Sequence, residues 1–201
     1  MKRSGQPPKF SHVKLLPLDT PELVKLVASW LAEKENYQWL DFGGGKQLVT
    51  PELLKVMGQR KSHFLRVYTT DEDDRPIGIV GLNSVDRNFR TAMLWGASGD
   101  KSFRGRGYAT LAGSKFLTLA FRDLGLNAIN TWVAERNPSL RIIERLGFRF
   151  IGRQRQCHYI DGRAYDRLFF DLLASEHREI KRGRPRRTEG SHRKDERVEH
   201  V

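Results

Sequence analysis

The sequence has a single cysteine, Cys157, among its 201 residues. One cysteine can neither form a disulfide within the chain nor supply a cysteine-based zinc site, so packing must stabilise the fold. The sequence also lacks an uncharged apolar run long enough to span a bilayer. We therefore expect a soluble protein with no membrane partner and no metal, located in a reducing compartment, the cytoplasm.

Acidic residues are few: Asp and Glu number 24 against 36 Lys and Arg, which gives a net charge of +12. The electric field of such a positive charge attracts polyanions, including phosphate-rich cofactors, RNA and DNA. The length suits one globular domain with terminal extensions. The apolar share of 38% lies below the usual globular average, which indicates that part of the chain is disordered.

The C-terminal segment is the part that lacks apolar residues. From residue 177 to 201 it holds nine basic and five acidic residues, and its only large apolar residues are Ile180 and two valines. Such a segment cannot bury enough surface to offset the entropy of ordering. We expect a flexible N-terminus over residues 1–9, one folded domain over 10–175, and a disordered basic tail over 176–201.

The tail contains the run Lys181–Arg187, whose sequence KRGRPRR resembles an AT-hook, a basic segment that lies in the minor groove of A·T-rich DNA. The alternative is a solvated basic tail that contacts any polyanion, including RNA, through phosphates. Nucleic acid, either DNA or RNA, is therefore a candidate partner of this run.

Within the folded part, apolar residues alternate between strand and helix periods. Thr20-Pro21 and Thr50-Pro51 are typical helix starts, and Asp161-Gly162 is a strong hairpin signal. The fold class that follows is α/β, or α+β, with a mixed central sheet. The predicted strands are 12–18, 64–69, 77–82, 91–97, 128–134, 148–159 and 165–173, and the predicted helices 20–31, 51–57, 107–122 and 139–146.

The most informative segment, Phe103–Thr110, lies between a predicted strand and the start of an amphipathic helix. A helix N-terminus presents unpaired N–H groups, and Gly105 and Gly107 let a diphosphate approach the backbone. The alternative is a glycine turn with solvated arginines. Arg104, Gly107 and Ala109 match the Arg/Gln-x-x-Gly-x-Gly/Ala signature of the GNAT acyltransferase superfamily, which the chain resembles.

A second segment carries the same resemblance. Residues 137–148, NPSLRIIERLGF, are similar to the Asn-led helix of that family, which ends in Gly-Phe. The residues that follow resemble the branch of ribosomal-protein N-terminal and polyamine acetyltransferases. The resemblance implies a GNAT-like, mostly antiparallel sheet flanked by helices, and acetyl-CoA as the donor.

By that resemblance, the pantetheine arm lies between strands that end near Gly99 and Ala134, and Asn137 contacts it. Asn137 serves equally well as an ordinary helix cap. The implied cofactor-binding residues are Gly99, Arg104, Gly105, Arg106, Gly107, Tyr108, Ala109, Thr110 and Asn137.

At the positions expected for proton transfer, the sequence departs from the pattern of the family. Many relatives carry a Tyr where this chain has Ile143. The branch with ribosomal-protein substrates instead has a Ser on the Asn-led helix, and Ser139 is the closest hydroxyl to it, so the resemblance implies Ser139 as the candidate acid, with helix capping as its alternative. His158 stands where the branch has a Glu and is the candidate base, with a structural role as its alternative. The six histidines lie too far apart in sequence to suggest a metal site.

These observations predict an acetyl-CoA-dependent N-acetyltransferase in which a primary amine attacks the thioester directly in a ternary complex. A protein N-terminus is the leading acceptor, ahead of a polyamine or another small amine. The alternative from a different class is a nucleic-acid-associated acyl-CoA-binding or scaffold protein with a degenerate acetyltransferase fold.

Overall fold

The computed structural model describes residues 12–41, 49–70 and 72–181. Its centre is a seven-stranded sheet with the order β1-β2-β3-β4-β5-β7-β6. All neighbouring strands run antiparallel except β4 and β5, which are parallel. The elements are β1 (Leu15–Pro17), α1 (Pro21–Leu31), α2 (Lys34–Tyr37), α3 (Pro51–Gln59), β2 (Phe64–Thr69), β3 (Pro76–Asp86), β4 (Thr91–Ser98), a 3-10 helix (Lys101–Phe103), α4 (Tyr108–Arg122), β5 (Ala128–Ala134), α5 (Leu140–Arg145), β6 (Arg149–Ile160) and β7 (Arg163–Leu173).

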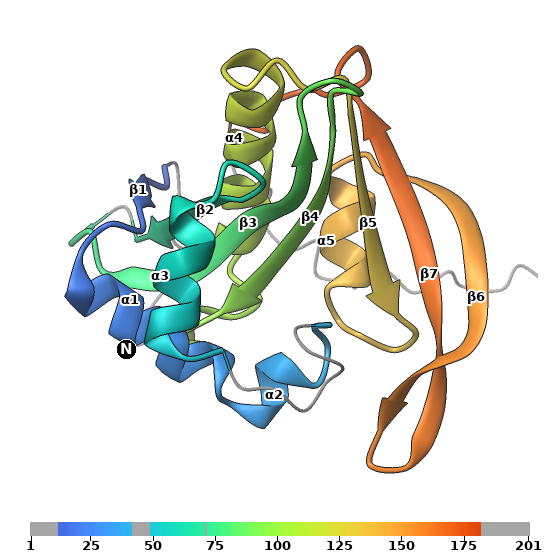
Figure 1. Cartoon of the computed structure of the whole chain (residues 1–201), viewed down its shortest axis with the longest axis horizontal. Helices are drawn as coiled ribbons and strands as arrows, with labels where there is room; N and C mark the ends of the chain where they lie inside the picture. The colour runs from blue at the N-terminus through green and yellow to red at the C-terminus, as the bar shows by residue number, and fades with distance from the viewer. Residues whose placement is uncertain (1–11, 42–48, 71, 182–201) are drawn as a thin grey trace, which may run out of the picture.

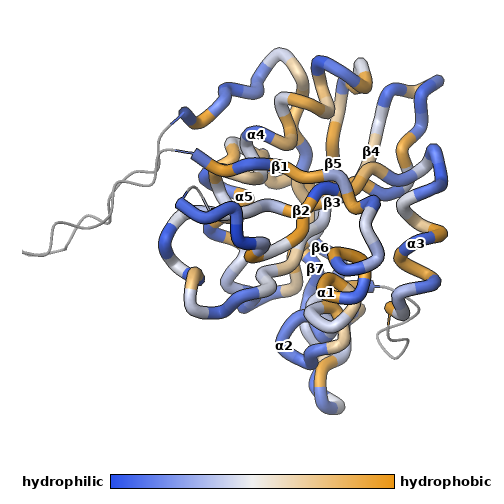
Figure 2. Tube along the Cα trace, turned by 90° about the vertical axis from the view of Figure 1, so that its left-hand side faces the viewer, coloured by the Kyte–Doolittle hydropathy of each residue, from blue (hydrophilic) through white to orange (hydrophobic). Residues whose placement is uncertain are grey.

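The helices cover both faces of the sheet (Figure 1). Helices α1 and α3 pack on one face, in a cluster with Leu65, Val67 and Ile79. Helices α4 and α5 pack on the other, where Phe116 of α4 is fully buried. The helices are amphipathic, and α3 shows the alternation of hydrophobic and hydrophilic residues plainly in Figure 2.

Strands β4 and β5 pair over a short distance and then separate. Their register covers only Thr91–Met93 against Ala128–Asn130, although β4 continues to Ser98 and β5 to Ala134. Beyond that point the hydroxyl of Thr131 donates to the carbonyl of Leu94 at 2.9 Å, and the strand ends diverge in Figure 1. The sheet therefore opens between the carboxyl ends of β4 and β5.

The predicted mixed sheet flanked by helices is confirmed, as is the hairpin turn at Asp161-Gly162. The predicted strand over 12–18 is too long, because only Leu15–Pro17 pairs with β2. Helix α2 was not predicted from the sequence, since four residues are too few to show a helical period.

The described chain continues beyond the boundary predicted at residue 175. The side chains of Thr118 and His177 are hydrogen-bonded at 2.8 Å, and Ile180 N–H donates to Ser114 Oγ at 2.7 Å. Ile180 also packs against the core of the α4 face. Residues 176–181, predicted as tail, thus dock on α4, whereas Arg182 to Val201 and the predicted flexible residues 1–9 lie outside the described ranges.

No helix within the described ranges is long and apolar enough to cross a membrane.

Candidate active site

The glycine loop before α4 has the geometry of an anion cradle. Gly105 and Gly107 have φ angles of +75° and +96°, and a Cβ added to either would meet no atom within 4 Å. Leu111 N–H makes a helical hydrogen bond to the carbonyl of Gly107. The backbone amides before it, including those of Ala109 and Thr110, therefore lie at the open, electropositive end of the helix.

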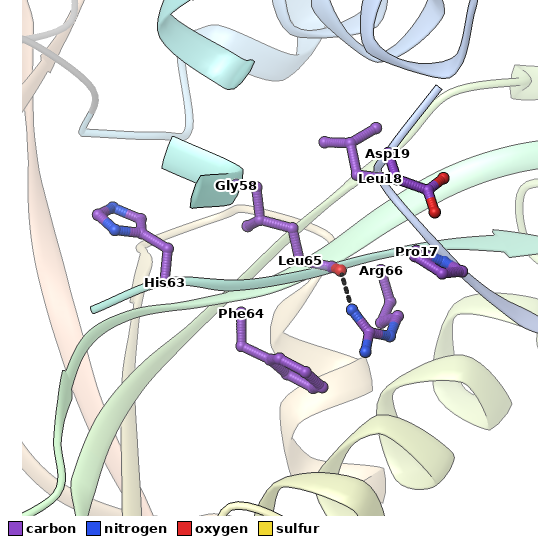
Figure 3. Close-up of a pocket in the computed structure, with 8 residues that line it drawn as sticks. All are labelled: Pro17, Leu18, Asp19, Gly58, His63, Phe64, Leu65 and Arg66. Carbon is purple, nitrogen blue, oxygen red and sulfur yellow. Dashed lines mark hydrogen bonds between the residues drawn. The ribbon is translucent and has the colours of Figure 1, made fainter. Parts of the chain in front are cut away.

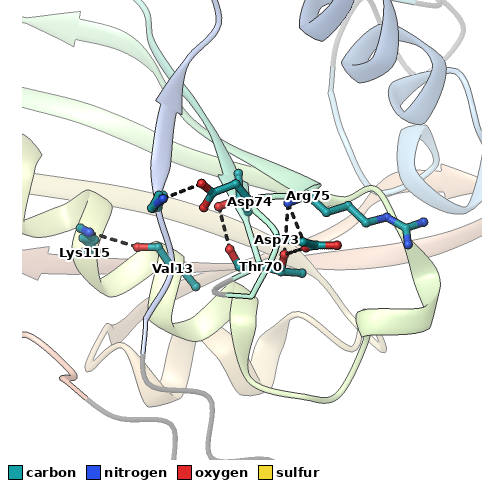
Figure 4. A network of polar contacts seen from close by, with 8 residues as sticks. Val13, Thr70, Asp73, Asp74, Arg75 and Lys115 are labelled. Carbon is teal, nitrogen blue, oxygen red and sulfur yellow. Dashed lines mark hydrogen bonds and ion pairs between the residues drawn. The ribbon is translucent and has the colours of Figure 1, made fainter.

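Neighbouring segments hold this cradle in place. The carbonyl of Ile77 accepts the backbone N–H groups of both Gly99 and Asp100, and Asp100 Oδ1 accepts from Ser102 N–H at 2.9 Å. Arg75 pairs with Asp100 at 2.7 Å. Figure 4 shows Arg75 reaching out of the turn between β2 and β3 that contains Thr70 and Asp73. The cradle is thus braced from the β2–β3 turn.

Several residues predicted to bind the cofactor make packing contacts within the protein. A Cβ on Gly99 would come within 2.3 Å of the Trp30 ring, so glycine lets α1 pack against the end of β4. Tyr108 is buried and contacts the ring of Phe103 edge to face, and Arg106 lies over the same ring at 5.1 Å. Only the backbone of Tyr108 can therefore belong to a phosphate site.

Helix α2 is tied to the cradle by ion pairs. Arg104 Nη1 lies 2.9 Å from Glu35, and Lys101 Nζ lies 2.9 Å from Glu33 and 3.2 Å from Glu35. The pKa of the Glu35 carboxyl is lowered, chiefly by its hydrogen bond from Arg104 and next by that from Lys101. A diphosphate in the cradle would compete with Glu35 for the guanidinium of Arg104.

The turn after β5 places the other predicted residues near the open end of the sheet. Asn137 Oδ1 accepts the backbone N–H of Ser139 at 2.9 Å, which is a capping interaction. Ser139 precedes α5, is partly exposed, and makes no side-chain capping bond. Ile143 is buried in the core, so the position that many relatives fill with a Tyr serves packing here.

A pocket of about 490 Å³ lies between α2 and the β6–β7 hairpin. We call it the acceptor pocket. Trp132, in the separated half of β5, contacts two of its lining residues: its ring lies 5.5 Å from that of His158 and 4.0 Å from the guanidinium of Arg167. The acceptor pocket therefore adjoins the opening between β4 and β5. Its lining residues are Lys34, Tyr37, Gln38, Leu40, Asp41, Cys157, His158, Tyr159, Ile160, Asp161 and Arg167.

His158 is buried, and both of its ring nitrogens have partners. Nε2 lies 2.7 Å from the carbonyl of Gln38, which can only accept, so Nε2 carries the proton. Nδ1 then accepts from Arg167 Nη2 at 3.3 Å. For His158 to take a proton at Nδ1, the guanidinium of Arg167 must move away from that nitrogen.

The sequence did not indicate Trp132, Arg167 or α2 as parts of the site. Arg167 Nη1 pairs with Asp41 at 2.8 Å, across more than a hundred residues of sequence. No local sequence pattern signals such a pair. Among the described residues, no cluster of three metal-ligating side chains occurs.

A smaller pocket of about 160 Å³ lies between the end of β1, the end of α3 and the start of β2. Figure 3 shows the Arg66 side chain turned back to donate to the carbonyl of Leu65. Its guanidinium also lies 4.1 Å from the Phe64 ring. None of the predicted site residues lines this pocket, and we assign it no part in the chemistry.

The mixed sheet that opens between β4 and β5, next to the glycine loop, is the arrangement expected of the acyltransferase family that the sequence resembles. Residues 12–149 match the family model described as "Acetyltransferase (GNAT) domain". Because this match covers more than half of the chain, the protein belongs to the GNAT family of acetyltransferases. The predicted family is confirmed.

Two curated relatives are Bacillus proteins. The chain is 34% identical over 102 residues to "Putative ribosomal N-acetyltransferase YdaF" of Bacillus subtilis (strain 168), covering 49% of this chain and 54% of that protein. It is 31% identical over 125 residues to "Uncharacterized N-acetyltransferase p20" of Bacillus licheniformis, covering 62% and 68%. The chain thus spans about half the length of YdaF and about two thirds of p20.

Solved structures share the fold at lower identity. The spermidine N-acetyltransferase from Vibrio cholerae, in complex with CoA and spermine, has a TM-score of 0.73 at 20% identity and covers 83% of this chain and 98% of its own. RimL, a ribosomal L7/L12 alpha-N-protein acetyltransferase in complex with CoA, has a TM-score of 0.68 at 15% identity and covers 83% and 97%.

Proposed function

We propose that this protein transfers the acetyl group of acetyl-CoA to a primary amine by direct attack in a ternary complex. The amine nitrogen bonds to the thioester carbonyl carbon, the C–S bond breaks, and CoA leaves as a thiolate that takes up a proton. The nitrogen loses one proton in the same reaction, so the overall products are an amide and free CoA thiol. Acetyl-CoA acts as a substrate, and no metal takes part.

The observation that carries this proposal is the contact of α2 with both halves of the site. Glu35 pairs with Arg104 of the cradle, while Lys34, Tyr37 and Gln38 line the acceptor pocket. The opening between β4 and β5 lies between the cradle and the acceptor pocket. A diphosphate in the cradle and an amine in the acceptor pocket would thus approach each other across the separated strands.

The open edge of β4 suits the extended arm of CoA. Beyond Met93, the β4 backbone has no strand partner on the side of β5 among the described residues. Backbone amides at such an edge can pair with the amides of pantetheine and donate to an oxyanion at the thioester carbon. Asn137 Nδ2 donates to no other described residue, and we propose that it contacts this arm.

We propose that Ser139 and His158 assist the proton transfers. Ser139 stands just beyond β5, where its hydroxyl can donate to the departing thiolate. His158 lies in the acceptor pocket with an imidazole that can take a proton once Arg167 moves from Nδ1. A free α-amine needs little such help, because its pKa of about 8 leaves about one tenth of it neutral at pH 7.

An assay of CoA thiol release tests the proposed function. Acetyl-CoA is incubated with the protein and, in turn, with free N-terminal peptides, polyamines and aminoglycosides. We expect release that depends on one of these amines and on the protein. If CoA binds and no amine in the panel causes release, the acyl-CoA-binding or scaffold alternative is supported instead. That alternative is not favoured, since the family model describes an acetyltransferase domain and the named relatives are N-acetyltransferases.

We also propose a cytoplasmic location and a nucleic-acid tether. The free thiol of Cys157 suits a reducing compartment. The run Lys181–Arg187 lies mostly outside the described residues and carries five basic side chains in seven residues. A basic segment gains affinity for nucleic acid by releasing counterions from phosphates.

Deleting residues 182–201 should weaken binding to DNA or RNA and leave turnover of a small amine unchanged. The cut follows Lys181 so that Ile180 and His177 keep their contacts with α4. Affinity and its dependence on salt, measured by titration with labelled duplex and RNA, should both fall. A preference for A·T-rich duplex that Arg184→Ala removes would favour minor-groove binding. Equal binding by both proteins at low salt would refute the tether.

A further inference from the structure

The acceptor pocket contains two carboxylates and two permanent cations, and the four form two ion pairs. Lys34 Nζ lies 2.6 Å from Asp161 Oδ1, and Arg167 Nη1 lies 2.8 Å from Asp41 Oδ2. The first pair is exposed, whereas the side chain of Arg167 is only 17% exposed and is stacked on Trp132. With His158 neutral, the described lining of the pocket carries no net charge.

The acidic residues around the pocket are compensated in the same way. Glu33 and Glu35 pair with Lys101 and Arg104. Asp166 of β7 pairs with Arg153 at 3.3 Å and accepts the backbone N–H of Gln156. A polyamine carries several positive charges, each of which loses hydration on binding, and a facing carboxylate is needed to offset that cost. Every carboxylate named here already faces a cation, so a polyamine would have to displace one.

The pocket is also poorly equipped to deprotonate a strongly basic amine. Both nitrogens of His158 are hydrogen-bonded, and both lining carboxylates are ion-paired. At pH 7 the neutral fraction is about one tenth for an α-amine and about 1 in 2,500 for an alkyl amine of lysine's basicity, a difference of about 250-fold. Because His158, the proposed base, must first lose its bond to Arg167, the pocket favours the acceptor with the larger neutral fraction.

The groups next to the amine of a candidate acceptor must also fit the pocket lining. The remaining lining includes Tyr37, Leu40, Tyr159 and Ile160, which present rings and aliphatic carbon. A free amino acid would bring a carboxylate, and neither lining cation is without an anionic partner to receive it. A peptide N-terminus brings one ammonium group followed by neutral amides, which fits a lining of zero net charge.

We infer that Lys34 and Arg167 set the acceptor specificity of this enzyme, because by neutralising Asp161 and Asp41 they make the acceptor pocket select the α-amino group of a peptide over a polyamine. This inference rests on the proposed function and names the acceptor class for the same site. Of these two cations, Lys34 is the better residue to replace, since its side chain is exposed and ion-paired with Asp161. Arg167 also contacts the rings of His158 and Trp132, so replacing it would disturb more of the site.

The experiment compares kcat/KM at pH 7 for short neutral peptides with a free N-terminus, for the same peptides with a blocked N-terminus and one lysine, and for spermine. In the wild type, the free N-terminus should exceed the other two by about 100-fold or more. Lys34→Gln exposes the charge of Asp161 and should raise kcat/KM for spermine about fivefold at low salt, with the gain shrinking as salt is added.

Two matched variants control for this change. Lys25→Gln removes an exposed lysine from the neighbouring helix α1, outside the acceptor pocket, and should leave the peptide-to-spermine ratio unchanged. Adding Asp161→Asn to Lys34→Gln restores a neutral pocket and should return the ratio to the wild-type value. Equal use of spermine and peptide by the wild type, or equal ratios in the Lys34 and Lys25 variants, would overturn the inference while leaving the acetyltransferase activity established. Absence of turnover with every amine would instead refute the proposed function.

Discussion

Gly107→Val should weaken the binding of CoA by about 100-fold or more, as measured by calorimetry. The space around this glycine is open, so a valine side chain would occupy the volume that the cradle offers to the diphosphate. Losing two charge-assisted hydrogen bonds from backbone amides costs about 3 kcal/mol, which corresponds to about 100-fold in affinity. The effect should appear in CoA binding before any acceptor is added.

Gly125→Val is the matched control for this variant. Gly125 lies beyond the other end of α4, also has a positive φ of +66°, and also has no atom within 4 Å of an added Cβ. Both substitutions force a β-branched residue into the left-handed region and should destabilise the fold by about 1–3 kcal/mol. Only Gly107→Val should lose CoA. Wild-type CoA affinity in a folded Gly107→Val protein would show that the diphosphate binds elsewhere.

Ser139→Ala and His158→Gln should each lower kcat by about 100-fold if they transfer protons. Glutamine is chosen at 158 because its amide can still donate to the carbonyl of Gln38, as Nε2 does now, but cannot titrate. Serine 139 makes no capping bond with its side chain, so alanine there removes little besides the hydroxyl.

The pH profile separates catalysis from structure in these variants. A loss of kcat at His158 through proton transfer should remove one limb of the profile, whereas a positioning role would lower the rate at all pH values equally. Ser139→Thr, which keeps a hydroxyl, should retain more activity than Ser139→Ala. Unchanged kcat and unchanged profiles in both variants would reject this acid and base and direct attention to water, Tyr159 or Cys157.

Local signals explain why much of the fold could be predicted from the sequence. Thr20 and Thr50 cap α1 and α3 as their Thr-Pro pairs indicate, and the Asp-Gly pair turns the chain between β6 and β7. The glycine turn before α4 was predictable for the same reason, since Gly105 and Gly107 stand directly before an amphipathic helix. Each of these features depends on residues a few positions apart.

The family resemblance indicated His158, but most of the acceptor side of the site could not be predicted, because it is made by residues distant in sequence. Lys34 and Asp161 are 127 residues apart, and Gln38 and His158 are 120 apart. Helix α2 has one turn, and its place depends on Asn36, whose side-chain amide donates to the carbonyls of Trp30 and Ser98. Likewise, Ile180 is an isolated apolar residue in a basic segment of the sequence, and its packing against the core at α4 is evident only in the folded structure.

The most direct test of direct transfer in a ternary complex is a set of initial rates in which acetyl-CoA and the accepting amine are both varied. If both substrates must be bound before the acetyl group moves, reciprocal plots at different amine concentrations should intersect. Cys157, the one thiol of the chain, lines the acceptor pocket and is the obvious residue to carry an acetyl group in a two-step route. Parallel lines in those plots would contradict the proposed mechanism and indicate such an acetylated enzyme.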